Sequence, residues 1–248
     1  MNSKLGLVSV SFRQLSVLEI IKLIKAEGMS LVEWGSDVHA PIDDIEKLEQ
    51  IAELQKEYGI KCSSYGTYFK VGTTPIEELE SYIKAAKILG TNVLRIWCGD
   101  KDSENYSESE KQKLFEECKK LSEIAEQNVV VLCLECHGWT YTNRLSSALE
   151  VMEVVNSDSF KMYWQPNQFR SYEENLEYAE NIAKYTVNIH VFNWDGEDKF
   201  PLIEAKEKWQ EYLKKFSGNE NLFLEFMPDG KPESLTTEYA ALKEIVGE

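Results

Sequence analysis

The chain has few positive charges and no long apolar run. Its 27 lysines and arginines stand against 43 aspartates and glutamates, a formal net charge of −16. This balance disfavours electrostatic binding to nucleic acid or to an anionic membrane surface. No apolar stretch reaches the about 18 residues that a transmembrane helix needs. The amino-terminal residues run directly into a strand-like pattern, without an apolar leader and cleavage site. We therefore expect a cytoplasmic protein with no nucleic-acid or membrane partner.

Two further kinds of sequence signal are missing. No GxGxxG or P-loop glycine pattern follows the first apolar run, and no stretch rich in proline, glycine or serine interrupts the chain. The first absence disfavours a doubly wound nucleotide-binding sheet. The second disfavours a boundary between two domains.

Cysteine is also scarce, with five residues scattered along the chain. An odd number without regular spacing does not indicate a disulfide framework. Cys133 and Cys136 form a CxxC pair, but residues three apart on a strand point to opposite faces. The sequence therefore favours structural roles for both thiols.

What the chain does contain is a regular alternation of short apolar runs and helix-like segments. Dividing 248 residues among eight such units gives about 31 residues each, a natural size for a strand, a crossover and a helix. This alternation implies a parallel sheet, and eight units favour a closed barrel over an open doubly wound sheet. We predict an α/β protein with a single (β/α)₈ TIM-barrel domain over residues 1–248. The expected strands are residues 5–10, 29–34, 60–65, 92–97, 129–135, 161–165, 187–192 and 221–226.

Capping signals mark the helix boundaries. A hydroxyl residue stands three positions before a glutamate at four expected helix starts, which is the capping-box pattern. Glycines follow three expected helix ends, where a left-handed conformation stops the helix. The boxes begin at Ser16, Thr74, Ser107 and Ser171, and the glycines are Gly28, Gly59 and Gly90.

Polar residues end the last four apolar runs, namely Glu135, Gln165, His190 and Glu225. The carboxyl ends of barrel strands meet at one rim, where polar residues are typical of catalytic sites. A single strand-end glutamate more often belongs to a structural ion pair, and a single buried histidine to a packed core. The recurrence at four corresponding positions favours a functional site.

Alternation along each strand predicts which way these side chains face. Successive side chains point to opposite faces, so the leucines beside Glu135 meet the helices while Glu135 itself faces the barrel interior. The same rule places His137 with Glu135, Tyr163 with Gln165, Asn188 and Phe192 with His190, and Phe223 and Met227 with Glu225.

Two glutamates and a histidine facing one another need a counter-charge, because burying unpaired charge is costly. A divalent cation supplies it most simply. Oxygen ligands with one imidazole suit Mn²⁺, Mg²⁺ or Co²⁺, and Zn²⁺ stays open. The predicted ligands are Glu135, Gln165, His190 and Glu225.

Five other residues are candidates for contact with a substrate. Aromatic rings at strand ends either stack on the apolar faces of sugars or pack at the rim or in a subunit interface. Arg95 shares a strand face with Trp97. It either points inward to bind an anionic or hydroxyl-rich substrate, or is buried as the partner of Glu33 or another barrel carboxylate. His39 is expected to be a surface or capping residue. The five candidates are Trp34, Arg95, Trp97, His137 and Gln168.

The order of the strand-end residues resembles that of the xylose-isomerase-like TIM-barrel superfamily, which includes ketose 3-epimerases, hydroxypyruvate isomerases and inosose dehydratases. The resemblance rests on Glu135, the segment Gln165-Pro-Asn-Gln168, His190 and Glu225, and on EWGSDVHAP at 33–41. It covers essentially the whole chain. It implies a small-molecule sugar substrate, and relatives that form dimers or tetramers leave a homo-oligomer open.

The resemblance also implies a mechanism and a reaction class. Glu135 and Glu225 would bind the metal and act as the acid–base pair, with His190 as a third ligand. The metal polarises a carbonyl and its adjacent hydroxyl and stabilises an enediolate. One carboxylate takes a proton and the other returns one on the opposite face, which inverts a stereocentre. The expected activity is that of a sugar isomerase or epimerase acting on a ketose or related polyol.

Two positions depart from the family pattern. The family usually has Asp at the position of Gln165 and often His at the position of Gln168. Gln165 can offer its carbonyl oxygen but brings no charge, so we expect weaker metal binding. Gln168 cannot change protonation, although it can hydrogen-bond a sugar hydroxyl.

Three other functions occur on related barrels. An inosose-type dehydratase would eliminate a β-hydroxyl from the same enediolate. A non-catalytic sugar-binding barrel is favoured by Gln165 and Gln168 and disfavoured by the two retained glutamates. A related apurinic endonuclease, with three zinc ions and many histidines, is disfavoured by the negative charge and by a total of 3 histidines.

Overall fold

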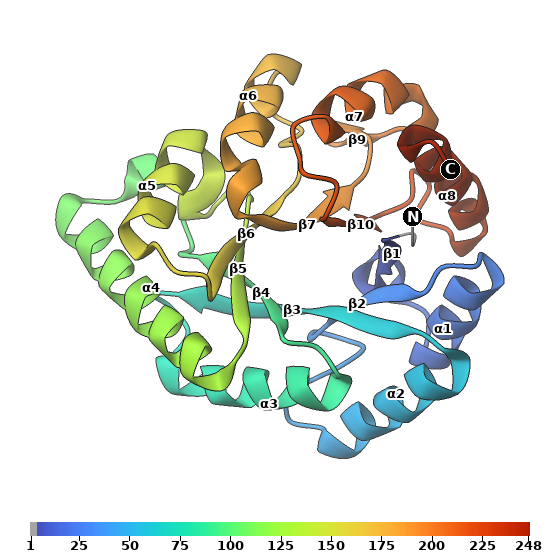
Figure 1. Cartoon of the computed structure of the whole chain (residues 1–248), viewed down its shortest axis with the longest axis horizontal. Coiled ribbons are helices and arrows are strands. Elements are labelled where there is room, and N and C mark those ends of the chain that lie inside the picture. Colours follow the sequence, from blue (N-terminus) through green and yellow to red (C-terminus); the bar gives the residue numbers. More distant parts are fainter. Residues whose placement is uncertain (1–3) are drawn as a thin grey trace.

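The computed structural model describes residues 4–248 of the chain. Within this range eight parallel strands form a closed barrel, in the order β1-β10-β7-β6-β5-β4-β3-β2, and helices surround it (Figure 1). The predicted (β/α)₈ barrel is therefore confirmed, although the first three residues of the predicted domain lie outside the described range. The barrel strands are β1 Leu5–Val8, β2 Leu31–Gly35, β3 Lys61–Val71, β4 Val93–Cys98, β5 Val131–Glu135, β6 Phe160–Trp164, β7 Thr186–Val191 and β10 Asn221–Leu224.

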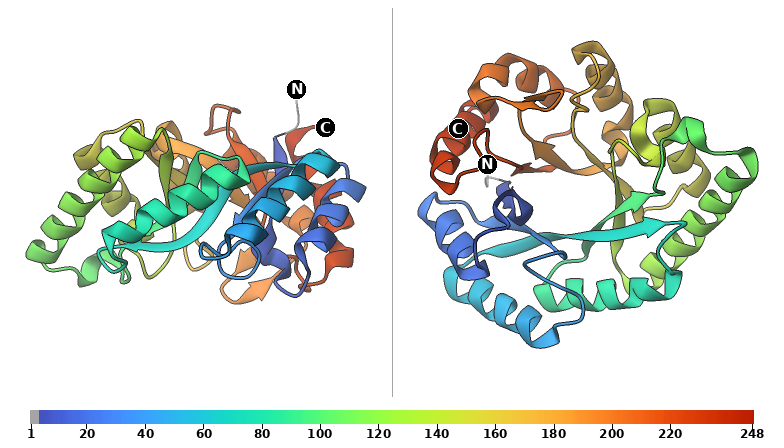
Figure 2. Two further views of the ribbon diagram at one scale, coloured as in Figure 1. Left: turned by 90° about the horizontal axis from the view of Figure 1, so that it is seen from below. Right: turned by 180° about the vertical axis from the view of Figure 1, so that it is seen from behind.

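The helices form the outer layer in both views of Figure 2. None of those within residues 4–248 is long and apolar enough to cross a membrane. Their bounds are α1 Val17–Ala26, α2 Ile45–Tyr58, α3 Leu79–Leu89, α4 Glu108–Asn128, α5 Leu145–Val155, α6 Tyr172–Ile182, α7 Lys206–Leu213 and α8 Leu235–Val246.

Three of the four predicted capping boxes are formed. Ser16, Ser107 and Ser171 each accept a hydrogen bond from the backbone of the glutamate three residues on, and that glutamate accepts one in return. The box predicted at Thr74 is wrong, because the Thr74 hydroxyl instead accepts a hydrogen bond from the Lys70 backbone N–H at 3.0 Å. A short 3₁₀ turn, Ile76–Glu78, then leads into α3.

One small sheet was not predicted. Trp194–Asp195 (β8) and Asp198–Lys199 (β9) pair antiparallel in the connection that follows β7. Gly196 supplies the positive φ of 57° that the tight turn between them requires. Strands of two residues carry no periodic signal, so the pattern of the sequence could not reveal them.

The barrel interior is polar through much of its depth. Asn221 on β10 donates to Asn188 on β7 at 2.8 Å and to Ser63 on β3 at 3.1 Å. Asn188 donates in turn to the Tyr163 hydroxyl on β6 at 2.5 Å. Interiors of such barrels are usually filled by branched apolar side chains. Here Phe223 forms a small separate apolar cluster with Val8 and Val10, against which the partly buried Leu31 and Phe226 pack.

The main apolar core lies between the barrel and the helices. Leu132, Leu134 and Cys136 of the fifth strand region belong to it, as the alternation predicts. Met227 belongs to it too, so its predicted grouping with Phe223 and Glu225 is wrong. The cause is Phe226, whose φ of 54° breaks the extended backbone between Glu225 and Met227. All five cysteines are buried free thiols.

Candidate metal centre

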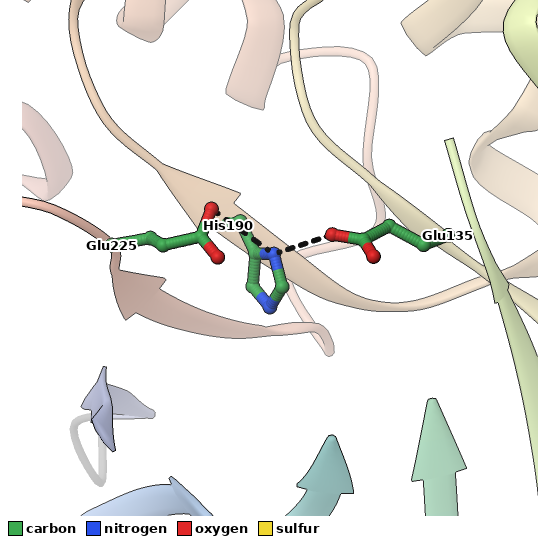
Figure 3. A group of neighbouring side chains, drawn as sticks. All are labelled: Glu135, His190 and Glu225. Carbon is green, nitrogen blue, oxygen red and sulfur yellow. Dashed lines mark ion pairs between the residues drawn. The ribbon is translucent and has the colours of Figure 1, made fainter. Parts of the chain in front are cut away.

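Three buried side chains converge where β5, β7 and β10 end. Glu135 is the last residue of β5, His190 lies near the end of β7, and Glu225 directly follows β10. The carboxylates of Glu135 and Glu225 face each other across the His190 ring (Figure 3). His190 Nδ1 lies 3.4 Å from Glu135 Oε1 and 3.5 Å from Glu225 Oε2. One ligand atom from each residue lies within 4.8 Å of the others, so the group could hold a metal ion.

Gln165 completes the set of four predicted ligands. It directly follows β6, and its side-chain oxygen lies 3.0 Å from His190 Nδ1. The structure thus brings all four residues to the same side of the imidazole. Their register in neighbouring strands explains this, since Phe223 is paired with His190 and Tyr163 with Asn188.

The electrostatics of this group suit a divalent cation. Burial by itself would lower the pKa of His190, but the Glu225 and Glu33 carboxylates outweigh it and raise that pKa to about 10. Burial raises the pKa of Glu225 above its ordinary value, and the neighbouring Glu135 carboxylate adds to the rise. Both shifts favour the protonated forms, so a cation bound here would compete with protons for these side chains. Two carboxylates, one imidazole and one amide oxygen form a donor set that divalent metals accept.

Arg95 is buried as an ion-pair partner, which is the second of the two alternatives left open by the sequence. Its Nε lies 2.9 Å from Glu33 Oε1, and its Nη1 donates to Glu135 Oε2. Burial alone would raise the pKa of Glu135, but the Arg95 guanidinium holds it well below its usual range. Arg95 also borders the cavity described below. A direct substrate contact for it stays a prediction.

Trp97 and His137 stand beside Glu135. Trp97 Nε1 donates to Glu135 Oε2 at 2.5 Å. The His137 ring stacks on the Trp97 ring, with centroids 5.4 Å apart. The backbone carbonyl of Gln168 accepts a hydrogen bond from the Gly196 N–H at 3.0 Å. All three residues border the cavity.

Trp34 does not line the cavity described below, so the prediction that it contacts the substrate is wrong. Its ring is fully buried, and Nε1 donates to Gln55 Oε1 on α2 at 2.6 Å. The reason is strand parity: Glu33 faces inward, so Trp34 must face the helices. His39, expected at the surface or as a cap, is buried beside it, with Nδ1 3.1 Å from Ser9 Oγ and Nε2 3.1 Å from the Leu15 carbonyl.

A cavity of about 740 Å³ opens above Glu135, Gln165 and Glu225. Its size is in the range of small-molecule sites. Trp139 and Phe169 on its border are 69% and 63% exposed, and Trp139 has a positive φ of 59°. Non-glycine residues held in that region often mark functional sites. The sequence marks Trp139 as an aromatic residue near a strand end, whereas Phe169 lies in a loop where periodicity gives no signal.

Glu33 also belongs to this site, although it does not stand at the end of its strand. It lies in the middle of β2, and its side chain is fully buried. The available signal was a charged residue at an inward position of an apolar strand.

Comparison with known proteins agrees with this architecture. Residues 21–217 match the model of the family described as xylose isomerase-like TIM barrel. A 3-dehydroshikimate dehydratase of Bacillus anthracis is 25% identical over 170 residues, which are 64% of this chain but 60% of that enzyme's length.

Solved structures show the same fold at low identity. The probable 3-DHS dehydratase AsbF from Bacillus anthracis superposes with a TM-score of 0.81 at 18% identity, over 98% of this chain and 99% of that chain. The IOLI protein with a bound zinc atom gives 0.77 at 18%, over 98% of each chain. A D-psicose 3-epimerase from Clostridium cellulolyticum H10 gives 0.71 at 12%, again over 98% of each. On the family match, the chain belongs to the xylose isomerase-like TIM barrel family.

Proposed function

We propose that the protein is a divalent-metal-dependent enzyme that isomerises or epimerises a ketose or a related polyol. The observation that carries the proposal is the pair of buried carboxylates, Glu135 and Glu225, facing each other across His190 beneath a cavity of about 740 Å³. The single barrel domain is proposed to account for the whole chain, residues 1–248.

Glu135, Gln165, His190 and Glu225 would hold the cation, with Mn²⁺, Mg²⁺, Co²⁺ and Zn²⁺ as the candidates. Such an ion polarises a carbonyl and a neighbouring hydroxyl and makes the carbon between them more acidic. Gln165 adds an oxygen without charge, which leaves Glu135 and Glu225 as the two charged ligands.

The proton steps are assigned to the two glutamates. Glu225 takes a proton from the carbon beside the carbonyl, and Glu135 returns one to the opposite face of the resulting enediolate. Their opposed directions in Figure 3 fit the two faces of a flat intermediate. Trp97, His137 and Gln168 on the cavity wall are assigned to binding the sugar.

A dehydratase is the second candidate, and one observation favours it. Glu135 Oε2 already accepts hydrogen bonds from Arg95 and Trp97, which makes Glu135 a poorer proton donor or acceptor than Glu225. One carboxylate is enough for an elimination: Glu225 takes the proton from the carbon beside the carbonyl and passes it to the β-hydroxyl, which leaves as water while a carbon–carbon double bond forms. The relative named 3-dehydroshikimate dehydratase supports this reading.

The two reactions give products that can be told apart when the solvent is D₂O. Epimerisation of a ketose adds one deuterium to the product at the carbon beside the carbonyl. Elimination from an inosose or from 3-dehydroshikimate gives a product lighter by one water that absorbs in the ultraviolet. We would load the protein with Mn²⁺, desalt it, count bound metal by mass spectrometry, and then screen both substrate sets.

Glu225→Gln is the test variant, and Glu238→Gln is its matched control. Glu238 on α8 is also a buried glutamate, but it accepts from the Leu202 backbone N–H and does not line the cavity. About one metal per chain and turnover, both reduced in Glu225→Gln but not in Glu238→Gln, support the proposal. Sugar binding that survives metal removal, with no turnover of any substrate, would instead identify a non-catalytic barrel.

A further inference from the structure

Glu33 is a fully buried carboxylate with three neighbours inside the barrel. Its Oε1 lies 2.9 Å from Arg95 Nε and 3.5 Å from His190 Nε2, and its Oε2 accepts from the Ser64 hydroxyl at 2.9 Å. A charge at this depth is costly unless it is paired and hydrogen-bonded. Glu33 therefore connects the proposed cation site to the interior layer beneath it.

The two nitrogens of His190 face different surroundings. Nδ1 lies on the side of Glu135, Gln165 and Glu225, whereas Nε2 is buried with no hydrogen-bond partner in the described residues and faces only the Glu33 carboxylate. Histidines that bind metals almost always donate their second ring N–H to a carboxylate, a carbonyl or water. Glu33 is placed to be that acceptor.

Arg95 connects the same carboxylate to a second ligand. Its Nε pairs with Glu33, and its Nη1 donates to Glu135 Oε2, which also accepts from Trp97. With Oε2 occupied twice, Oε1 is the oxygen that Glu135 presents towards His190 Nδ1. Arg95 thus orients the Glu135 carboxylate and also holds Glu33, the carboxylate that faces His190.

The backbone leaves room for this arrangement only at a glycine. A Cβ atom on Gly66 of β3 would lie 2.8 Å from Arg95 Nη2 and 2.8 Å from Glu33 Oε1. Real Cβ atoms essentially never approach that closely. The ion pair between Glu33 and Arg95 therefore depends on the absence of a side chain at Gly66 as well as on the two charged residues.

We propose that Glu33 and Arg95 are positioning residues of the cation site. Glu33 fixes His190 with Nδ1 towards the cation, and Arg95 fixes Glu135 so that Oε1 alone is offered. The proposal rests on the metal-dependent function above. Charge supports it: the carboxylates of Glu33, Glu135 and Glu225 are balanced by Arg95 together with a divalent cation when His190 is neutral.

The first test measures Mn²⁺ affinity by competition with a fluorescent chelator. The variants are Glu33→Gln, Arg95→Lys and the double variant Glu33→Gln/Arg95→Met, which removes the Glu33 charge together with its partner and so destabilises the fold less than Arg95→Met alone. His39→Gln is the control, since His39 is buried near β2 but contacts Ser9 and Leu15. Loss of a carboxylate that orients a metal-bound histidine typically costs 10- to 100-fold in metal affinity. We expect such a loss in all three variants and less than a twofold change in the control.

The second test reads the ring nitrogens directly. The chain has 3 histidines, so imidazole ¹⁵N spectra of Zn²⁺-loaded protein can be assigned by single substitutions. We expect His190 to be metal-bound through Nδ1 and to carry a slowly exchanging proton on Nε2. In Glu33→Gln that proton should exchange faster. A purely structural role of Glu33 would change the unfolding temperature without moving this signal.

The outcomes separate the two proposals. Wild-type protein that binds no Mn²⁺ overturns the metal-dependent function and this inference together. Wild-type binding with affinity within threefold in the folded variants, or a Zn²⁺ ion bound through Nε2, overturns the positioning role alone.

Discussion

Replacing Arg95 by methionine would leave two buried carboxylates without their counter-charge. Methionine fills similar space without charge, while Glu33 and Glu135 remain almost fully buried. Arg95 is the first charge that offsets the burial of Glu33, and with His190 it holds the Glu33 pKa at about 2 instead of 4.5. That difference corresponds to about 3 kcal/mol, at about 1.4 kcal/mol for each tenfold change in the equilibrium. Removing one partner of a buried ion pair typically costs about 3–5 kcal/mol, which agrees.

The effect has a definite dependence on pH. Because the folded-state pKa of Glu33 lies below its ordinary value, its stabilising contribution is present above about pH 4.5 and is lost as the pH falls towards 2. In Arg95→Met the carboxylate has lost its main counter-charge and favours the protonated form when buried. The stability difference between wild type and variant should therefore be largest near neutral pH and shrink on acidification.

The assay is urea unfolding followed by tryptophan fluorescence in buffer with EDTA, at pH 7.5 and pH 4.5. We expect Arg95→Met to lose about 3 kcal/mol or more at pH 7.5 and less at pH 4.5. Glu33→Gln/Arg95→Met should recover part of the loss at pH 7.5, because it buries one carboxylate fewer without a partner. A loss below about 1 kcal/mol, the range of exposed ion pairs, or a loss equal at both pH values, would refute the reasoning.

Three further predictions concern single positions. Gln165→Asp adds a third charged ligand at the rim, so Mn²⁺ affinity measured by chelator competition should rise about tenfold, a change of about 1.4 kcal/mol; an unchanged affinity would place Gln165 outside the ligand set. Trp139→Ala removes a ring that is 69% exposed, so the unfolding midpoint should hardly move. The KM of the substrate found in the screen should rise by about 3- to 10-fold from lost stacking, and an unaltered KM would count against a binding role. Gly66→Ala forces a Cβ against Arg95 and Glu33, so the free energy of unfolding should fall by about 1–3 kcal/mol; a stability equal to wild type would show that the pair can shift to make room.

Much of the architecture could be predicted from the chain because the two-residue period of its strands and the alternation of strands with helices are both clear. The alternation of runs and helices gave the barrel, and strand parity brought Glu135, Gln165, His190 and Glu225 to one rim. Parity held wherever the backbone stayed extended. It failed for Met227 because Phe226 adopts a φ of 54°, which no local pattern announces.

Other parts of the site were out of reach for different reasons. Trp34 was judged by its residue type, although the position of Glu33 beside it already implied an outward direction. The ion pair between Arg95 and Glu33 joins residues 62 apart in sequence, so only the closed barrel decides between the two alternatives. The β8–β9 hairpin and the exposed ring of Phe169 lie in connections without periodicity.

The polar interior also bears on how the chain acquires its shape. Asn221 on the last barrel strand donates to Asn188 on β7 and to Ser63 on β3, across the lumen. The bond between Asn221 and Ser63 joins residues 158 apart in sequence, so neither half of the chain can complete it alone. A half-barrel would leave Asn221 and Ser63 without each other, whereas an apolar lumen could collapse in several registers. The hydrogen bonds therefore act as a check on closure: a strand that slips by one residue turns its polar group outward and forfeits its partner. The correct register of several strands is therefore needed at once to form this polar layer, which lies directly beneath the candidate metal centre.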